Sequence, residues 1–326
     1  MTESSDTQLQ ALLQALPQYR RCIVTSHING EGDSFGSQLA LAHLLRQLGK
    51  EVMVINDSAV PINLQFLPGI AHLQQPGNRL PPHDAVFVVD VPVLERLGKV
   101  ATLLDRAKPL IVIDHHIPQQ PFGTLCYIDP QAAAAGELVY RLYDALRVPI
   151  DREAAILLYV TLLTDTGSFR YANTTARVHR LAAQLLEAGV EPAAIYQQIY
   201  EHRSLADLRL HAAALQTLHV SDDGTLAWLA LPRAVLAQTG ATLESAEALI
   251  DLPRSLWGTD AVFVMREVEP NTWRVSLRSK GRVDVNAVAQ RFGGGGHRAA
   301  SGCTIQGSEA EVLQQLVSVL RAACPP

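Results

Sequence analysis

Short apolar runs alternate with helical patterns along the first half of the chain. Apolar runs at 22–26, 51–55, 85–89 and 110–113 predict buried strands, and the leucines of 36–48 fall on one face of a predicted helix. Strands that are apolar almost throughout, with helices between them, are typical of a parallel sheet covered on both faces. The pattern therefore predicts an N-terminal doubly wound α/β domain.

The pattern changes after a helical stretch at about 178–218 that is rich in Leu, Ala and Gln. Beyond it, 226–231 and 261–268 predict strands, and 273–279 predicts a strand that pairs back through a hairpin. A short helix, a loop of four glycines, a further strand and a closing helix complete a smaller C-terminal α+β domain. We therefore expect two domains and a helical linker, at 1–185, 219–326 and 186–218 respectively.

Composition describes a core-rich globular chain, with 48% hydrophobic and 18% charged residues among 326. Apolar runs stay well short of the roughly 18 residues that a membrane span needs, and the polar start is unlike a signal peptide. The four cysteines never form a C-x-x-C pair, which favours reduced thiols. We expect a cytoplasmic protein without a membrane partner.

Charge is unevenly distributed along the chain. The net charge of -5 disfavours binding of a long nucleic-acid duplex over a broad surface. The segment 271–306 is the exception, because it holds six basic residues and one acid. On the predicted strand 273–279, Arg274 and Arg278 alternate with apolar residues and so face away from the core. This split favours a local anion site on an otherwise acidic protein.

Polar residues of the first half collect where strands end. His27, Glu31 and Asp33 follow the first strand, Asp90 follows the third, and Asp165 follows a helix. Three further residues, Asp114, His115 and His116, follow the fourth strand. The carboxyl ends of parallel strands share one edge, so these side chains would meet in one crevice, where a cation would offset their repulsion. Mixed carboxylate and imidazole ligands suit Mn, Fe or Zn, and the number of ligands favours two ions.

Other interpretations exist for these residues. A single Asp after a strand is more often a helix cap, and a single His is more often solvated. Gly30, Gly32 and Gly36, with Asp57, also form a weak match to a dinucleotide-binding turn, which would favour an oxidoreductase. Carboxylates inside that turn would repel a pyrophosphate, so the metal interpretation is stronger.

The segment 293–298 (GGGGHR) is the most specific local feature of the second half. Four successive glycines carry a high entropic cost, which favours a place where a ligand or another backbone approaches closely. Together with Arg278 they suggest a clamp for an anion or nucleotide, and a flexible hinge is the alternative.

These segments together resemble the DHH phosphoesterase family, in the branch with a glycine-rich DHH-associated C-terminal domain, and within it the bacterial nanoRNases and pAp phosphatases. The resemblance rests on five segments in the family's order: 27–37 (HINGEGDSFGS), 88–90 (VVD), 114–116 (DHH), 164–169 (TDTGSF) and 293–302 (GGGGHRAASG). A family II pyrophosphatase would share the N-terminal motifs, but the glycine segment argues against it.

The resemblance implies two Mn2+ ions, with Mg2+ or other divalent ions as alternatives, in an active site in the interdomain cleft. It implies ligands for one ion in His27, Glu31 and Asp90, and for the other in Asp33, Asp90, His115 and Asp165. It further implies that His116 contacts the scissile phosphate and that Asp114 orients the histidines. The residues implied for holding the substrate's phosphate or nucleotide are Arg278, Gly294, Gly295, Gly296 and His297.

The implied activity is hydrolysis of short oligoribonucleotides to mononucleotides, of pAp to AMP, or of both, by water activated between the ions. A cyclic dinucleotide phosphodiesterase is the alternative, and a homodimer is left open. The chain departs from the family at Glu31, where the family usually has Asp. The extra methylene displaces the carboxylate by roughly 1.5 Å, so we expect an altered first metal site. A nucleotide-binding protein with weakened catalysis is therefore a further alternative.

Overall fold

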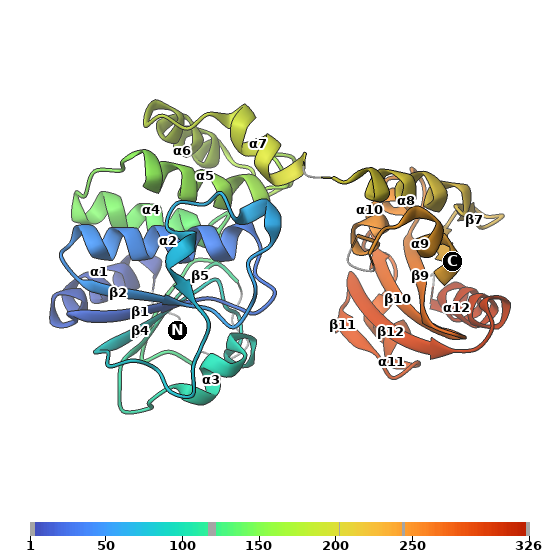
Figure 1. The fold of residues 1–326 in the computed structure, drawn as a ribbon, viewed down its shortest axis with the longest axis horizontal. Helices are drawn as coiled ribbons and strands as arrows, with labels where there is room; N and C mark the ends of the chain where they lie inside the picture. Colours follow the sequence, from blue (N-terminus) through green and yellow to red (C-terminus); the bar gives the residue numbers. More distant parts are fainter. Residues whose placement is uncertain (1–3, 117–121, 202, 243–244, 324–326) are drawn as a thin grey trace. The chain divides into compact units, whose positions relative to one another are not determined.

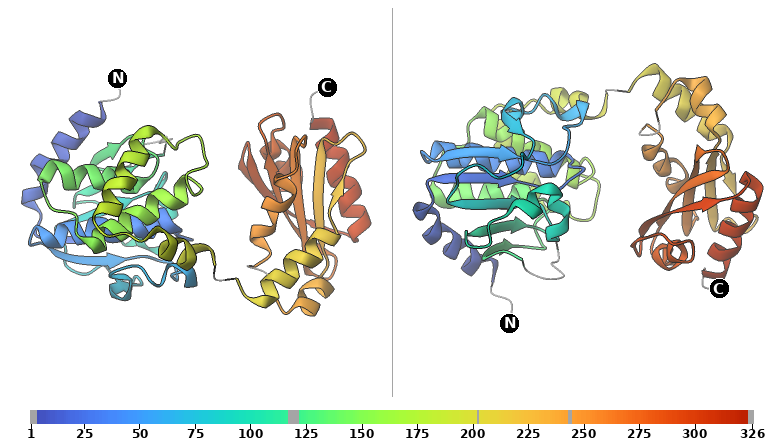
Figure 2. Two further views of the ribbon diagram at one scale, coloured as in Figure 1. Left: turned by 90° about the horizontal axis from the view of Figure 1, so that it is seen from above. Right: turned by 60° about the horizontal axis from the view of Figure 1, so that its bottom comes forward.

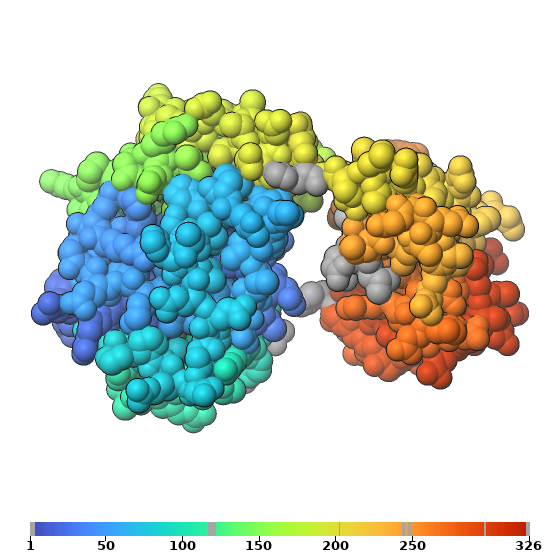
Figure 3. Space-filling view, in the orientation of Figure 1, coloured from blue at the N-terminus to red at the C-terminus, as the bar shows by residue number. Residues whose placement is uncertain are grey.

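The computed structural model describes residues 4–116, 122–201, 203–242 and 245–323. The chain divides into two compact units, Met1–His202 and Arg203–Pro326. Each unit has its own hydrophobic cores and forms a closely packed body in the space-filling view (Figure 3). The predicted helical stretch at 178–218 contributes helix α7 (Pro192–Tyr200) to the first unit and α8 (Leu205–Gln216) to the second.

The first unit is built on a parallel sheet with the strand order β3-β2-β1-β4-β5-β6 (Figure 1). Its strands are β1 (Arg21–Thr25), β2 (Glu51–Ile55), β3 (Leu73–Gln74), β4 (Ala85–Val89), β5 (Leu110–Asp114) and β6 (Leu125–Ile128). The remaining helices of this unit are α1 (Ser5–Ala15), α2 (Gly32–Gln47), α3 (Lys99–Leu103), α4 (Ala135–Leu146), α5 (Arg152–Asp165) and α6 (Ala176–Glu187). The predicted doubly wound α/β fold is confirmed, and it contains β3, β6, α1, α3 and α4 in addition to the predicted elements.

Helices cover both faces of this sheet (Figures 1 and 2). Along β1, Cys22 and Val24 pack toward α2, α4 and α5, whereas Ile23 packs toward α3 on the opposite face. From β1 the chain first adds β2 and β3 on one side of the sheet and then returns to add β4, β5 and β6 on the other side. The strand order therefore reverses between the neighbouring strands β1 and β4. In such sheets ligands bind beyond the carboxyl ends of the strands at this reversal. The fold therefore places the ends of β1 and β4 at the expected binding crevice.

Helix α2 begins at Gly32, four residues earlier than the pattern predicted. The Ser34 hydroxyl accepts a hydrogen bond from the Glu31 N–H (2.9 Å), which closes the first turn. Gly36 therefore lies inside the helix, and a Cβ atom there would come within 2.7 Å of Thr161 Cγ2 and 2.9 Å of the Leu157 carbonyl oxygen on α5. The glycine permits close packing of two helices and does not form a phosphate-binding turn.

The second unit contains a mixed sheet with the strand order β11-β12-β10-β9-β8-β7. Its strands are β7 (His219–Val220), β8 (Leu226–Leu231), β9 (Ala261–Glu269), β10 (Thr272–Ser279), β11 (Gly295–His297) and β12 (Ala300–Gln306). Its remaining helices are α9 (Arg233–Thr239), α10 (Asp251–Arg254), α11 (Val285–Gln290) and α12 (Glu309–Ala323). The predicted β9–β10 hairpin is confirmed. The predicted four-glycine loop is wrong in part, because Gly295 and Gly296 pair with β12 as a strand.

Alternation along β10 follows the prediction. Trp273, Val275 and Leu277 are buried in one core of the unit, and the alternating Arg274 and Arg278 line a cavity outside that core.

Among the described residues, Cys22, Cys126 and Cys303 are free thiols, and Cys324 lies outside them. Within the same residues, none of the helices has the length and apolar character needed to span a membrane.

Candidate metal centre

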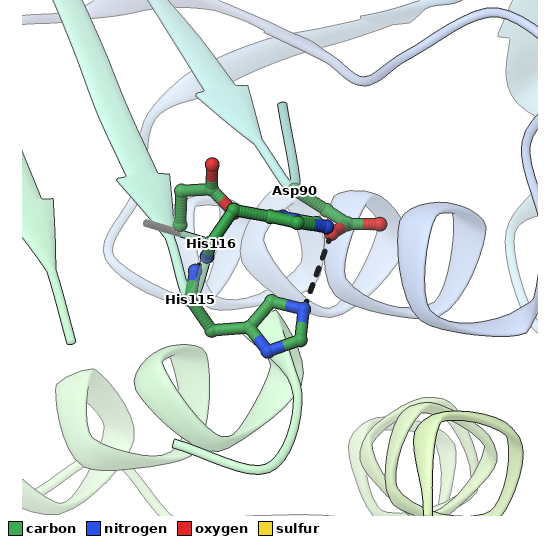
Figure 4. Close-up of side chains that lie close together, drawn as sticks. Asp90, His115 and His116 are labelled. Carbon is green, nitrogen blue, oxygen red and sulfur yellow. Dashed lines mark hydrogen bonds and ion pairs between the residues drawn. The ribbon is translucent and has the colours of Figure 1, made fainter. Parts of the chain in front are cut away.

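The reversal in strand order brings carboxylates and imidazoles together from five segments. Asp90 directly follows β4, the pair His115 and His116 follows β5, and His27 follows β1 by one residue. Asp33 comes from the first turn of α2 and Asp165 from the last residue of α5. Figure 4 shows the side chains of Asp90, His115 and His116 turned toward one another. The structure thus brings most of the predicted ligands into one cluster.

His115 lies at the centre of the cluster. Its Nε2 atom is 3.1 Å from an oxygen of Asp165, 3.5 Å from Asp90 and 3.6 Å from Asp33. Two groups of potential ligand atoms share this histidine, and within each group the atoms lie within 4.8 Å of one another. One group is Asp33, His115 and Asp165; the other is Asp90, Asp114, His115 and His116.

Asp90 is held in an uncommon backbone conformation. Its φ angle is 59°, in the left-handed region that non-glycine residues rarely occupy, although Asp and Asn tolerate it best. The Asp90 N–H donates to the Ile113 carbonyl (3.1 Å), which ties the end of β4 to β5. Its carboxylate reaches His27 Nε2 at 3.3 Å on one side and His115 on the other. Asp90 therefore connects the two halves of the cluster.

Asp33 is fixed by the N-terminus of another helix. Its carboxylate accepts hydrogen bonds from the N–H groups of Ala135 (2.7 Å) and Gly136 (3.1 Å), which are the first residues of α4. The Ser37 hydroxyl also donates to it (3.0 Å). The Asp33 carboxylate thereby satisfies two of the backbone N–H groups that every helix leaves unpaired at its start. The buried carboxylate thus caps α4 and also faces His115.

Asp114 orients the two histidines that follow it. One of its oxygens accepts from the N–H groups of His115 (2.7 Å) and His116 (3.1 Å) and lies 2.8 Å from His116 Nδ1. This contact leaves Nε2 of His116 directed away from Asp114, and the His116 side chain is 42% exposed. This geometry leaves Nε2 of His116 available to a ligand that enters from solvent.

His27 and Glu31 lie at the edge of the cluster. Nδ1 of the buried His27 lies 2.8 Å from the Ile28 carbonyl and 3.0 Å from Nη2 of Arg96. Glu31 is exposed at the start of α2 and is in neither of the two ligand groups of the described residues. Arg96, on the 3-10 helix η4 (Leu94–Leu97), did not figure in the sequence prediction, because a single arginine in an irregular segment gives no pattern.

Burial and charge shift the ionisation of the cluster in opposite directions. Burial raises the pKa of Asp33 well above its usual range, and the charges of Asp90 and Asp165 add to the rise. Burial also acts to raise the pKa of Asp90, but bonds from His115 and His27 outweigh it and bring that pKa to about 2. Burial lowers the pKa of His115, yet its bonds to Asp165 and Asp90 outweigh this effect and raise the pKa to about 12.

The carboxylates around His115 favour a positive charge at this point of the cluster. A divalent cation would supply that charge and would leave the imidazole neutral and able to coordinate. Carboxylate oxygens and imidazole nitrogens within a few ångströms form the donor set that suits Mn, Fe or Zn. The residues therefore fit a metal centre. The pKa of Glu31 is raised as well, first by desolvation of its carboxyl group near the cluster and then by the charges of Asp165 and Asp90.

The alternative dinucleotide-binding turn finds no support in the contacts of its residues. Gly36 lies within α2, and the carboxylate of Asp57 accepts a hydrogen bond from the Lys99 N–H (2.6 Å) at the start of α3. Asp57 therefore caps a helix in the same unit.

The second unit contains the other predicted binding residues. Arg278 and Gly294 line a cavity of about 530 Å³, together with Arg274 and Ser276 on β10. Gly294 also has a structural reason to be glycine, because a Cβ atom there would collide with the Gly302 carbonyl. Gly295, Gly296 and the backbone of His297 form β11, and the His297 side chain lies outside the described part. None of the described residues that line this cavity is acidic, so it suits an anion.

Comparisons with known proteins agree across both units. The DHH family N-terminal domain matches residues 21–162 and the DHHA1 domain matches residues 230–324. The bifunctional oligoribonuclease and PAP phosphatase NrnA of Thermus thermophilus is 33% identical over 294 residues, which cover 90% of this chain and 87% of the relative. The protein of the same name from Bacillus subtilis is 29% identical over 301 residues, which cover 90% of this chain and 92% of the relative.

A solved structure shares the fold. The exopolyphosphatase-related protein from Bacteroides fragilis aligns with a TM-score of 0.88 at 25% identity, over 99% of this chain and 98% of that protein.

Proposed function

The chain belongs to the DHH family, and on this basis we propose that it is a metal-dependent phosphoesterase that hydrolyses short oligoribonucleotides to mononucleotides and pAp to AMP. The observation that carries the proposal is that carboxylate oxygens of Asp33, Asp90 and Asp165 all lie within 3.6 Å of Nε2 of His115. The names of the two NrnA relatives support the choice of substrates. The cytoplasm is the proposed compartment.

We propose the metal ligands that the family resemblance implies. His27, Glu31 and Asp90 would hold one ion, and Asp33, Asp90, His115 and Asp165 the other, with Mn2+ as the proposed metal. When bound, such ions neutralise phosphate oxygens and activate water for attack on phosphorus. Asp90 lies between His27 and His115 and so would bridge the two positions.

The remaining residues of the cluster would act on the substrate. His116 would contact a non-bridging oxygen of the scissile phosphate through Nε2, while its Nδ1–H donates to Asp114. Burial lowers the pKa of His116, but the bond to Asp114 and the charge of that carboxylate outweigh it and raise the pKa, which favours the ring protonated on both nitrogens and so able to donate from Nε2. In the second unit, Arg278, Gly294, Gly295, Gly296 and His297 are the proposed binding residues for a phosphate or nucleotide.

The activity is tested by product analysis on a panel of substrates. Purified protein is incubated with pApA, pAp, a five-nucleotide RNA and a cyclic dinucleotide, each in Mn2+ and in Mg2+. We expect mononucleotide products from pApA and AMP from pAp. Preferential cleavage of the cyclic dinucleotide would favour the phosphodiesterase alternative. Tight nucleotide binding without turnover in either metal would favour a binding protein.

The metal centre is tested at Asp90. The variant Asp90→Asn suits the left-handed backbone at this position and removes one negative charge. We expect it to lower kcat by more than about 100-fold, since loss of an outer-shell partner alone costs up to that factor. The matched control is Asp105→Asn, at an exposed turn in the same unit. Full Mn2+-dependent hydrolysis by the Asp90 variant would contradict the proposed ligand set.

A further inference from the structure

Arg96 presents an exposed guanidinium at the edge of the metal centre. Its backbone is fixed, because the Ile28 N–H donates to the Arg96 carbonyl (2.8 Å) and so joins η4 to the segment after β1. The Nη2 atom then lies 3.0 Å from Nδ1 of His27 and 3.4 Å from the Ile28 carbonyl oxygen. Among the described residues this guanidinium forms no ion pair, although its charge acts on the carboxyl group of Glu31.

Nδ1 of His27 is placed between a donor and an acceptor. The Ile28 carbonyl, 2.8 Å away, can only accept a hydrogen bond, whereas the guanidinium of Arg96 can only donate one. A neutral imidazole meets only one of these demands at a time. With the proton on Nδ1, the ring donates to Ile28 and its Nε2 lone pair is free. With the proton on Nε2, the ring donates to Asp90 (3.3 Å) and accepts from Arg96.

Coordination of a cation through Nε2 selects the first of these tautomers. In that tautomer Nδ1 no longer accepts from Arg96, which retains its charge and its planar set of N–H donors. Guanidinium groups bind phosphate oxygens through two parallel hydrogen bonds. The residue is exposed, so a phosphate could reach it from solvent.

We propose that Arg96 binds a non-bridging phosphate oxygen of the substrate, and that it is released for this role when the tautomer of His27 changes on cation binding. The inference rests on the proposed function for the identity of the phosphate. It makes cation and phosphate binding mutually reinforcing, since both favour the tautomer with the proton on Nδ1.

The test compares Arg96→Gln and Arg96→Lys with the matched control Arg106→Gln, an exposed arginine of the same unit. The KM for pApA is measured at saturating Mn2+, and the affinity for inorganic phosphate is measured by calorimetry under the same conditions. Loss of a charged hydrogen-bonding partner predicts a KM and a phosphate Kd roughly 10- to 150-fold higher in Arg96→Gln. Arg96→Lys, which keeps the charge, should lie between this variant and the wild type.

Mn2+ affinity in the absence of nucleotide separates this role from a purely positioning one. If Arg96 only supported His27, its removal would weaken Mn2+ binding. The proposal predicts equal or tighter binding, because Arg96→Gln removes both a competing partner of Nδ1 and a positive charge. In the metal-free protein, the 15N shifts of the His27 ring should also move toward the tautomer protonated on Nδ1.

Two results would overturn the proposal. One is a phosphate affinity and a KM in Arg96→Gln that match those of Arg106→Gln; the other is a loss of Mn2+ affinity. If the wild-type protein hydrolysed none of the nucleotides, the proposed function would fail. The phosphate and Mn2+ titrations would still decide the role of Arg96.

Discussion

Glu31 places a longer carboxylate at the edge of the proposed metal centre than the family resemblance implies. The residue is the N-cap of α2. Two residues further on, Asp33 is buried and fixed by three donors, whereas Glu31 is exposed. A longer carboxylate on a fixed backbone meets a metal position less well, because ligand distances tolerate only about 0.2 Å.

Glu31→Asp is therefore expected to tighten binding of the first metal ion. The shorter side chain restores the reach that the family pattern implies and loses less rotamer entropy on coordination. Calorimetric titration with Mn2+ measures the change, with Glu95→Asp on the neighbouring exposed turn as the control. Weaker or unchanged Mn2+ binding in Glu31→Asp would show that the structure has adapted to the longer side chain.

The close packing of α2 on α5 sets the positions of Asp33 and Asp165. Gly36 allows this contact, since a Cβ atom would meet both a side chain and a backbone carbonyl of α5. Gly36→Ala should lower the free energy of unfolding, because overpacking costs about 1–3 kcal/mol and alanine in a helix returns at most about 1 kcal/mol. Urea unfolding measures the loss.

Gly77→Ala is the control for this substitution, because its nearest neighbour would be 3.8 Å away. It should change the free energy of unfolding by less than about 0.5 kcal/mol. Equal stabilities of the two variants would mean that α2 and α5 separate at little cost.

Asp84 joins the starts of β1 and β4. Its carboxylate accepts from the N–H groups of Arg20 and Arg21 and from the Arg21 guanidinium. The backbone and side-chain bonds from Arg21 lower the pKa of Asp84 to about 2. A lowered pKa in the folded state means that the stabilisation is present above pH 4 and is lost as the pH falls toward 2.

Asp84→Asn should therefore unfold at a lower urea concentration than the wild type at pH 6, and the difference should disappear near pH 2. Urea midpoints measured across this range check the expectation. A difference that stayed constant with pH would show that the negative charge of Asp84 does not contribute to the stability of the folded protein.

Sequence patterns predicted the elements whose signal is local. The apolar strands β1, β2, β4 and β5 and the polar residues after them were visible because strand and ligand are adjacent in the chain. Helix α4 was missed, and with it the reason that Asp33 is fixed, because its donors at Ala135 and Gly136 lie about a hundred residues away. The glycine segment was predicted as a loop because its pairing with β12 depends on a partner strand.

At the scale of the whole chain, the two units have separate cores, and every proposed metal ligand lies in the first unit. A ligand that binds only folded protein stabilises it by about 2.7 kcal/mol at a concentration 100 times its Kd. Addition of Mn2+ should therefore raise the unfolding temperature of the first unit and leave that of the second unit unchanged. Scanning calorimetry measures both transitions. EDTA should reverse the shift. A single transition that shifts as a whole would mean that the units unfold as one.

Asp33 both caps α4 and faces His115, and this makes it a poor position for a substitution that is meant to inactivate the protein and trap its substrate. Replacing Asp33 would remove a proposed metal ligand and also leave the N–H groups of Ala135 and Gly136 without their acceptor inside the protein. Lost activity would then not distinguish a disabled centre from a damaged fold. Asp165 is the better choice, because its side chain is 20% exposed and its contact in the cluster is with His115. An Asp165→Asn protein should keep its architecture and hold uncleaved RNA long enough for a complex to be crystallised.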